Sequence, residues 1–239
     1  MRTLLEQTAY VIRNVKCRIL FIVLRTYCRN LVLDVGGGDF FWFARKQGIP
    51  FKHWITVETD RTNTFTLTGN AWSFVLADGQ SLPFTNDSFD TVLGLHVFEH
   101  VFDPYRMFQE MLRVLKPGGH AVILLPQTTP LHHVPNHFQN FMVFWLREAA
   151  RREEAELVEY SSIGGFWGTI ASRMLYFFLQ CVRAKGYSYP ECERRPLFYL
   201  LLPFMIPWAI LNVVVGMVFV LGDLGEEATD HLAVLRKRV

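Results

Sequence analysis

Cysteine is scarce in this chain of 239 residues, and its four cysteines form no recognisable pattern. Cys17, Cys28, Cys181 and Cys192 have neither the paired spacing of a zinc site nor the density of a disulfide framework. We therefore predict no metal site and no oxidised scaffold. The N-terminal stretch also lacks the uninterrupted apolar core of a secretory signal, because basic residues break it. This favours a protein that faces the cytoplasm.

Net charge is also low, at +2, which is too little for a protein that binds nucleic acid through bulk charge. We expect no nucleic-acid partner. Hydrophobic residues nevertheless make up 51% of the chain, which excludes a disordered protein. The length suits one domain with elaborations and a sizeable core.

The most informative stretch that is present begins with the apolar run Leu31–Val35. Three glycines, Gly36, Gly37 and Gly38, follow it, and a helix-compatible segment comes after Phe40. The pattern predicts a strand, a tight turn and a helix. Because glycine lets backbone N–H groups approach a ligand closely, a nucleotide-like ligand is expected at this turn.

Polar residues recur where the following strands are predicted to end. Asp34, Glu58, Asp78 and His96 each close a short apolar segment. Such strands, alternating with helical patterns up to residue 126, predict a parallel sheet with helices on both faces. In open sheets of this kind ligands bind beyond the carboxyl ends of the strands, so these residues mark a candidate site.

Over about residues 30–126 the chain resembles the class I S-adenosylmethionine-dependent methyltransferases, particularly their small-molecule branch. The segments that carry the resemblance, in the family's order and spacing, are Val32–Gly38, Val57–Glu58, Ala77–Gly79, Leu82–Phe84, Ser88–Asp90, Phe98–Val101 and Leu112–Gly119. The resemblance implies an enzyme with a Rossmann-like α/β fold. Its sheet would have seven strands, the last of them antiparallel, with helices on both faces.

S-adenosyl-L-methionine is the cofactor that this resemblance implies. The implied cofactor-binding residues are Asp34, Gly36, Gly37, Gly38, Glu58, Asp78, Gly79 and His96. Glu58 would accept hydrogen bonds from the ribose hydroxyls, Asp78 would bind the adenine amino group, and Asp34 would organise the loop or meet the amino end. Any one of these acids can instead be a helix cap or a loop staple. The sequence departs from the family at Phe40, which occupies the place of a frequent third glycine.

Histidines are the candidates for proton transfer, which is needed only if the acceptor must lose a proton. His96 lies nearest the expected reacting end, whereas His100 is either a base or an architectural residue. His137 closes a histidine-containing loop, residues 126–137, that leaves the ligand-binding edge of the sheet. That loop covers an acceptor pocket or is a solvated linker.

The N-terminal residues 1–30 are expected to form an amphipathic helix ahead of a methyltransferase domain at residues 31–239. Its apolar positions include Ile19 and Ile22, and six basic residues accompany a single acid. Two interpretations remain open. The helix packs on the sheet or covers the cofactor cleft, or its basic surface touches anionic lipid.

Charge is absent altogether from residues 196–221, a stretch long enough to span a bilayer. Pro203 and Pro207 interrupt it, so we predict two short apolar helices joined near Pro207. A last strand at 229–235 would return the chain to the sheet, which excludes a single crossing. The insertion is expected to associate with a membrane, the alternative being a lid or dimer interface that packs on protein.

These features together predict a methyltransferase whose acceptor is small, lipid-like or lipid-linked, and presented at a membrane. We expect a peripheral or monotopic protein at the inner face of the cytoplasmic membrane. The alternative is a non-catalytic membrane-associated protein that retains the fold, an interpretation that Phe40 suggests. A nicotinamide enzyme is disfavoured, because its fingerprint needs a small residue where Phe41 stands.

Overall fold

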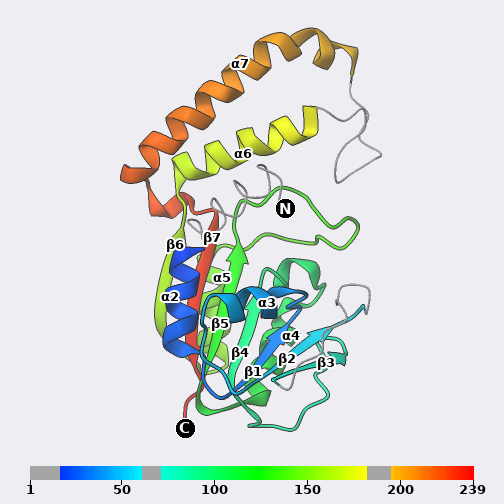
Figure 1. Ribbon diagram of the computed structural model, residues 1–239, viewed down its shortest axis with the longest axis vertical. Coiled ribbons are helices and arrows are strands. Elements are labelled where there is room, and N and C mark those ends of the chain that lie inside the picture. Colours follow the sequence, from blue (N-terminus) through cyan, green and yellow to red (C-terminus); the bar gives the residue numbers. More distant parts are fainter. Residues whose placement is uncertain (1–16, 61–70, 182–194) are drawn as a thin grey trace. The chain divides into compact units, whose positions relative to one another are not determined.

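A computed structural model describes residues 17–60, 71–181 and 195–239, shown in Figure 1. The described chain falls into two compact units. We call them the sheet unit, which lies within residues 1–125, 141–161 and 232–239, and the hairpin unit, which lies within 126–140 and 162–231. The first part of the predicted N-terminal helix, residues 1–16, lies outside the described residues.

The strands and helices follow the predicted alternation. In chain order they are α2 Arg18–Tyr27, β1 Leu31–Val35, α3 Phe40–Lys46, β2 His53–Glu58, β3 Trp72–Leu76, β4 Phe89–Leu95, η2 Phe98–His100, α4 Pro104–Val114, β5 Leu115–Pro126, α5 Val143–Arg152, β6 Glu156–Ile163, α6 Phe166–Cys181, α7 Pro196–Phe219, η3 Val220–Gly222, η4 Gly225–Glu227 and β7 Asp230–Arg236. The seven strands form one sheet in the order β3-β2-β1-β4-β5-β7-β6 (Figure 1).

The sheet is mixed, as predicted. Strands β1 to β5 pair in parallel, with Asp34 of β1 opposite Thr56 of β2 and Leu93 of β4. Strand β7 runs antiparallel to β5. Near the start of β5, Gly118 donates its N–H to the carbonyl of Lys237, just after the end of β7, at 2.9 Å. Just after the end of β5, Gln127 donates its N–H to the carbonyl of Thr229, which precedes β7. The prediction of a seven-stranded Rossmann-like sheet with an antiparallel last strand is confirmed.

Alternation along β1 assigns its side chains to two layers. Leu33 and Val35 are buried in a core with Met107 of α4 and Leu146 of α5. Val32, which precedes Leu33, is also fully buried. On the other side of the sheet Trp54 of β2 packs on Phe41 of α3, with ring centroids 6.1 Å apart. Each large side chain buried in this way contributes about 1.5–3 kcal/mol to folding. Asp34 lies on the Trp54 face, because side chains alternate along a strand.

The described part of the N-terminal helix, α2, packs on protein, but not through the face expected from sequence. Ile19 and Ile22 of the predicted stripe are 40% and 51% exposed. The buried positions are Leu20, Phe21, Val23 and Leu24. Residues 19–24 are all apolar, so hydrophobic periodicity cannot predict which face of α2 is buried. Tertiary contacts such as Phe21 on Phe43 determine the buried face.

The prediction of two short helices joined near Pro207 is wrong, because α7 runs unbroken through Pro203 and Pro207. A proline inside a helix removes one hydrogen bond and crowds the carbonyl four residues earlier, at a cost of about 3 kcal/mol. The helix contacts α6 near both of its ends, through Phe198 on Phe177 and Phe219 on Trp167. Together with η3, α7 is long and apolar enough to cross a membrane, which no other described helix is.

Candidate functional site

The glycine turn between β1 and α3 has no room for side chains. Gly36 and Gly38 have φ angles of +70° and +48°, a region that L side chains rarely adopt. A β-carbon on Gly36 would lie 2.3 Å from Cγ2 of Val97, in the segment that follows β4. Gly36 also donates its N–H to the carbonyl of Val57 at 2.8 Å. The turn is therefore held against the ends of both β2 and β4, and it requires glycine.

Asp34 lies beneath this turn and is fully buried. A β-carbon on Gly37 would lie 2.1 Å from Oδ2 of Asp34, so the turn closes over the carboxyl group. Neither carboxyl oxygen has a hydrogen-bond partner among the described residues. Burial raises the pKa of Asp34 to about 8; the Trp54 indole opposes this rise and the charge of Glu58 adds to it. A buried acid without a partner fits a ligand that brings a cation or a donor.

Glu58, at the end of β2, supports the same turn. Its Oε1 accepts the N–H of Gly38 at 2.8 Å. Phe40, which stands where the family often has a third glycine, begins α3, and its ring lies 6.2 Å from Trp54 and 6.4 Å from Phe43. The bulky side chain therefore belongs to an aromatic cluster between α3 and the sheet.

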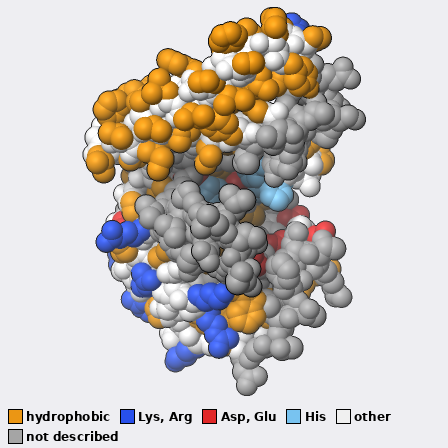
Figure 2. All heavy atoms as spheres, turned by 45° about the horizontal axis from the view of Figure 1, so that its top comes forward, with side chains coloured by type: hydrophobic (Ala, Val, Ile, Leu, Met, Phe, Trp, Pro, Cys, Tyr) orange, Lys and Arg blue, Asp and Glu red, His pale blue; other side chains and the backbone are white. Residues whose placement is uncertain are grey.

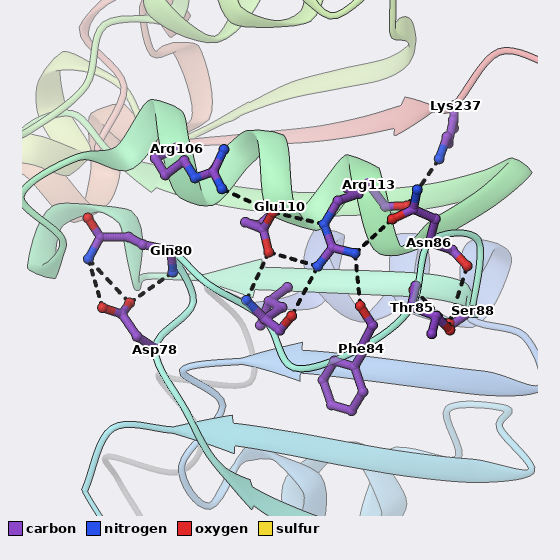
Figure 3. Close-up of polar contacts among 11 residues, drawn as sticks. Asp78, Gln80, Phe84, Thr85, Asn86, Ser88, Arg106, Glu110, Arg113 and Lys237 are labelled. Carbon is purple, nitrogen blue, oxygen red and sulfur yellow. Dashed lines mark hydrogen bonds and ion pairs between the residues drawn. The ribbon is translucent and has the colours of Figure 1, made fainter.

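Asp78 follows β3 and is exposed, and its carboxylate is already engaged. Gln80 donates its backbone N–H to Oδ1 at 2.8 Å, and its side-chain amide reaches both oxygens (Figure 3). Gly79 between them is buried, and a β-carbon there would lie 2.8 Å from Cγ1 of Val35. The Asp78 loop is thus packed on the end of β1, beside the glycine turn.

Two residues of α4 hold the loop that continues from Asp78. Arg113 donates to the carbonyls of Leu82 and Phe84 at 3.0 and 2.8 Å, and it pairs with Glu110 at 2.8 Å (Figure 3). Glu110 accepts the N–H of Leu82 at 2.9 Å. The hydrogen bond from Arg113 holds the pKa of Glu110 below its usual value, although burial opposes this. Sequence analysis placed Arg113 in a family motif without giving it this role.

A buried carboxylate lies at the end of β4 between two histidines. Glu99 of η2 is fully buried, and its Oε1 lies 3.4 Å from Nδ1 of His96 and 3.8 Å from Nε2 of His100. Burial raises the pKa of Glu99, but its interactions with His96 and His100 outweigh that effect, and the net shift is downward. His96 has a φ of +52°, and its side chain is 39% exposed. Sequence analysis named both histidines and missed the carboxylate between them.

His137 lies in the hairpin unit, where both of its ring nitrogens are engaged. Nδ1 accepts the N–H of His132 at 3.1 Å, and Nε2 lies 3.2 Å from Oδ1 of Asn140. Asn140 in turn donates to the carbonyl of Thr129 at 3.0 Å. These bonds give His137 a clear role in shaping its own loop.

The sheet unit therefore brings most of the predicted residues to one edge. The glycine turn lies against Asp34 through Gly37 and donates to Glu58 through Gly38. Gly79 packs on β1, and Val97, next to His96, lies against Gly36. Glu99 could have been suspected from sequence, since an acid between two histidines at a strand end is an unusual combination. The complete burial of Glu99 could not have been predicted from the sequence.

Comparison with known proteins supports a common origin for this part of the chain. Residues 33–123 match the family described as "Methyltransferase domain". An uncharacterized methyltransferase of Mycolicibacterium gilvum is 44% identical over 108 residues, which cover 41% of this chain and 40% of that protein. One from Mycobacterium tuberculosis H37Ra is 42% identical over 96 residues, covering 38% and 37%. The chain thus matches about two fifths of the length of these relatives.

Solved structures share the fold at low sequence identity. Phosphoethanolamine N-methyltransferase 2 of Haemonchus contortus, solved with S-adenosyl-L-methionine, has a TM-score of 0.57 and 14% identity, covering 95% of this chain and 53% of that one. The cyclase SpnF has a TM-score of 0.56 and 15% identity, covering 92% and 79%. A fold found in a methyltransferase and a cyclase leaves the reaction to be argued from the site.

The raised pKa of Asp34 makes stability depend on pH in a defined direction. Between the unfolded pKa, about 3.9, and the folded value of about 8, the folded state holds a proton that the unfolded state has lost. The free energy of unfolding should therefore fall as pH rises from 5 to 7, by up to about 1.4 kcal/mol per pH unit. Chemical unfolding of the ligand-free protein and of Asp34→Asn across this range measures the effect. Equal slopes for the two proteins would contradict it.

Loss of Arg113 should destabilise the sheet unit more than loss of Arg106, which also lies near Glu110. Arg113→Met leaves the buried Glu110 carboxylate and two carbonyls without their donor, which should cost about 3–5 kcal/mol. Arg106→Met is the matched control, because Arg106 lies 3.6 Å from Glu110 and is more exposed. We expect the control to cost less than about 1 kcal/mol in denaturant unfolding. Similar losses in the free energy of unfolding for both variants would show that Arg113 does not hold the loop at Leu82 and Phe84.

Proposed function

We propose that the protein is a class I S-adenosylmethionine-dependent methyltransferase that methylates a small, lipid-like acceptor presented at a membrane. Support comes from residues 33–123, which match the family described as "Methyltransferase domain". The observation that carries the proposal is the fully buried Asp34 carboxyl group beneath the glycine turn, for which the described residues supply no charged partner of opposite sign. The activity of the whole protein, its cofactor and its acceptor are all parts of this proposal.

The residues present fit S-adenosylmethionine. Its methionine end carries a positively charged ammonium group, which complements a buried acid that lacks a partner. The glycine turn lets backbone come close where a β-carbon would collide with Asp34 or Val97. Glu58 and Asp78 would contact the ribose and the adenine, as the family resemblance implies. The Haemonchus contortus neighbour, solved with this cofactor on the same fold, is consistent with that assignment.

When bound, S-adenosylmethionine supplies an electrophilic methyl group on a cationic sulfur. The chain's own contribution to the chemistry is to position the acceptor and, if required, to accept its proton. His96 is the residue proposed for this step, because Nδ1 faces the buried Glu99 and the side chain is 39% exposed. Glu99 orients the ring and stabilises the imidazolium that forms. His100 shares the same carboxylate and is the second candidate, whereas the engaged nitrogens of His137 make it the weakest of the three.

The hairpin unit supports an apolar acceptor. Residues 196–222 are free of charged side chains, and only 11% of the most apolar 18-residue stretch within them is buried. A catalytic domain joined to such a segment would meet substrates that partition into lipid. We accordingly propose a peripheral or monotopic protein at the inner face of the cytoplasmic membrane, with no nucleic-acid partner.

Cofactor binding separates this proposal from a non-catalytic protein that has kept the fold. In calorimetric titration with S-adenosylmethionine we expect saturable binding that Glu58→Gln weakens by at least about tenfold, because one charge-assisted contact is lost. Glutamine can still accept the N–H of Gly38, so the turn should survive. Glu148→Gln on α5, whose exposed carboxylate pairs only with Arg151 and Arg152, is the control and should bind normally. A folded protein with no detectable binding would favour the non-catalytic alternative.

Proton transfer by His96 predicts a selective loss of turnover. With radiolabelled S-adenosylmethionine and a total lipid extract, His96→Asn should reduce organic-phase labelling by about a hundredfold or more while cofactor affinity stays within about twofold. His137→Asn should have a smaller effect on labelling. Equal losses in the two variants, or a loss of cofactor affinity in His96→Asn, would show that His96 is not the base.

A further inference from the structure

The two long helices of the hairpin unit, α6 and α7, pack against each other at several points. Trp167, near the start of α6, lies against Phe219 at the end of α7, with ring centroids 5.0 Å apart. Phe177, near the end of α6, lies 6.4 Å from Phe198 at the start of α7. The helices are therefore antiparallel, as the ribbon shows (Figure 1). A β-carbon on Gly216 would lie 2.8 Å from that of Ala171, so the backbones approach closely.

The base of the hairpin is fastened by one carboxylate. Asp223, just after α7 and η3, accepts the N–H groups of Trp167 and Gly168 at 2.8 and 2.9 Å and so caps the start of α6. The hydroxyl of Thr169 donates to the carbonyl of Glu227 at 3.0 Å. The chain therefore enters and leaves the hairpin at the same end.

Most of the outer surface of α7 is apolar and exposed. Leu200, Phe204, Trp208 and Met217 are 64–75% exposed, and no charged residue occurs from Pro196 to Gly222. Figure 2 shows hydrophobic side chains gathered over this hairpin. Because apolar side chains occur on every side of the helix, it differs from an amphipathic helix that keeps one face in water. A surface of this kind fits the acyl region of a lipid leaflet.

Charges at both ends of the hairpin limit how it can enter the lipid. Arg195 precedes α7, and Asp223, Glu226 and Glu227 follow it. The sequence between the helices carries Arg183, Lys185, Glu191, Glu193, Arg194 and Arg195. Ionised groups are expensive at the centre of a bilayer, so neither end can stop there.

A transmembrane hairpin is also disfavoured by α6. Its 16 residues span about 24 Å, less than the roughly 30 Å of hydrocarbon, and the exposed Arg173 lies near its middle. A membrane-crossing α7 would need α6 as its return path, because both ends of the hairpin meet at Asp223. The remaining arrangement places both helices along one leaflet with their ends at the headgroups.

We propose that the α6/α7 hairpin is an in-plane membrane anchor, immersed in one leaflet, whose two ends stay on the same side of the bilayer. Arg173 and Arg195 would lie at the level of the lipid phosphates, which fits an anionic leaflet. This inference builds on the proposed function, since it specifies how a methyltransferase would meet acceptors dissolved in lipid. A second copy of the chain covering the same surface is the competing outcome.

Flotation of the full-length protein with vesicles of phosphatidylcholine and phosphatidylglycerol tests the anchor. We expect the wild type to float and Phe204→Glu with Met217→Glu to lose at least about tenfold in bound fraction. These side chains are exposed, so the variant should keep its fold. Phe144→Glu is the matched control, because Phe144 is 69% exposed on α5 in the sheet unit. A wild type that stays unbound and forms concentration-dependent dimers would overturn the anchor.

Labelling with a membrane-impermeant maleimide tests the in-plane arrangement. Cysteine replaces Arg195, Leu211 or Glu226 one at a time in a vesicle-bound protein without its native cysteines. We expect labelling at positions 195 and 226 and protection at 211. Protection at 195 that only detergent relieves would indicate a crossing and refute the proposal. Titrating the same samples with S-adenosylmethionine separates the two claims. Binding without flotation defeats the anchor and the membrane location but leaves the proposed methyl transfer standing, and flotation without binding defeats only the proposed methyl transfer.

Discussion

The burial of Asp34 beneath the glycine turn is the constraint on which the rest of the sheet unit depends. Burial of a carboxyl group disfavours folding, and the same burial raises the pKa of Asp34 although the Trp54 indole opposes the rise. The surrounding structure is arranged to tolerate it. Gly37 has no β-carbon that would collide with the carboxyl group, Glu58 accepts the N–H of Gly38, and Gly36 donates its N–H to Val57. In the proposed function, this buried acid is the group that a cationic ligand would neutralise.

The position of β7 places a second constraint on the chain. Because β7 lies between β5 and β6, the segment that leaves β6 must return to the same sheet. A closed hairpin satisfies this requirement, and Asp223 fastens its base. The apolar surface of α7 can then be large without any change to the sheet unit. The sheet and the exposed apolar helix can therefore occur in one chain, and the proposed anchor uses that helix.

How far the sequence predicts this molecule depends on how local each signal is. The glycine turn and the acids at strand ends were predictable, because turn chemistry and strand alternation are short-range patterns. The continuity of α7 through Pro203 and Pro207 was not predictable, because proline locally favours a helix break and the structure has none there. The buried face of α2 was also missed, since six consecutive apolar residues carry no periodic information.

The site shows the same division. Sequence identified Asp34, Glu58 and His96 as strand-end residues, but the lack of a partner for Asp34 follows only from three-dimensional packing. Arg113 and Glu110 of α4 bind the loop at Leu82 and Phe84, about thirty residues earlier in the chain, and no local sequence pattern reveals these interactions. The sequence shows Glu99 between two histidines, but only the structure shows that its carboxylate is fully buried.

Proton release on cofactor binding tests the central claim most directly. With a pKa of about 8, roughly nine-tenths of Asp34 is protonated at pH 7 in the free protein, and pairing with an ammonium group would ionise it. Calorimetric titration with S-adenosylmethionine at pH 7, in buffers of different ionisation enthalpy, counts the protons. The account predicts the release of close to one proton by the wild type and of none by Asp34→Asn. Binding that releases no proton, or no binding by the folded protein, would contradict it.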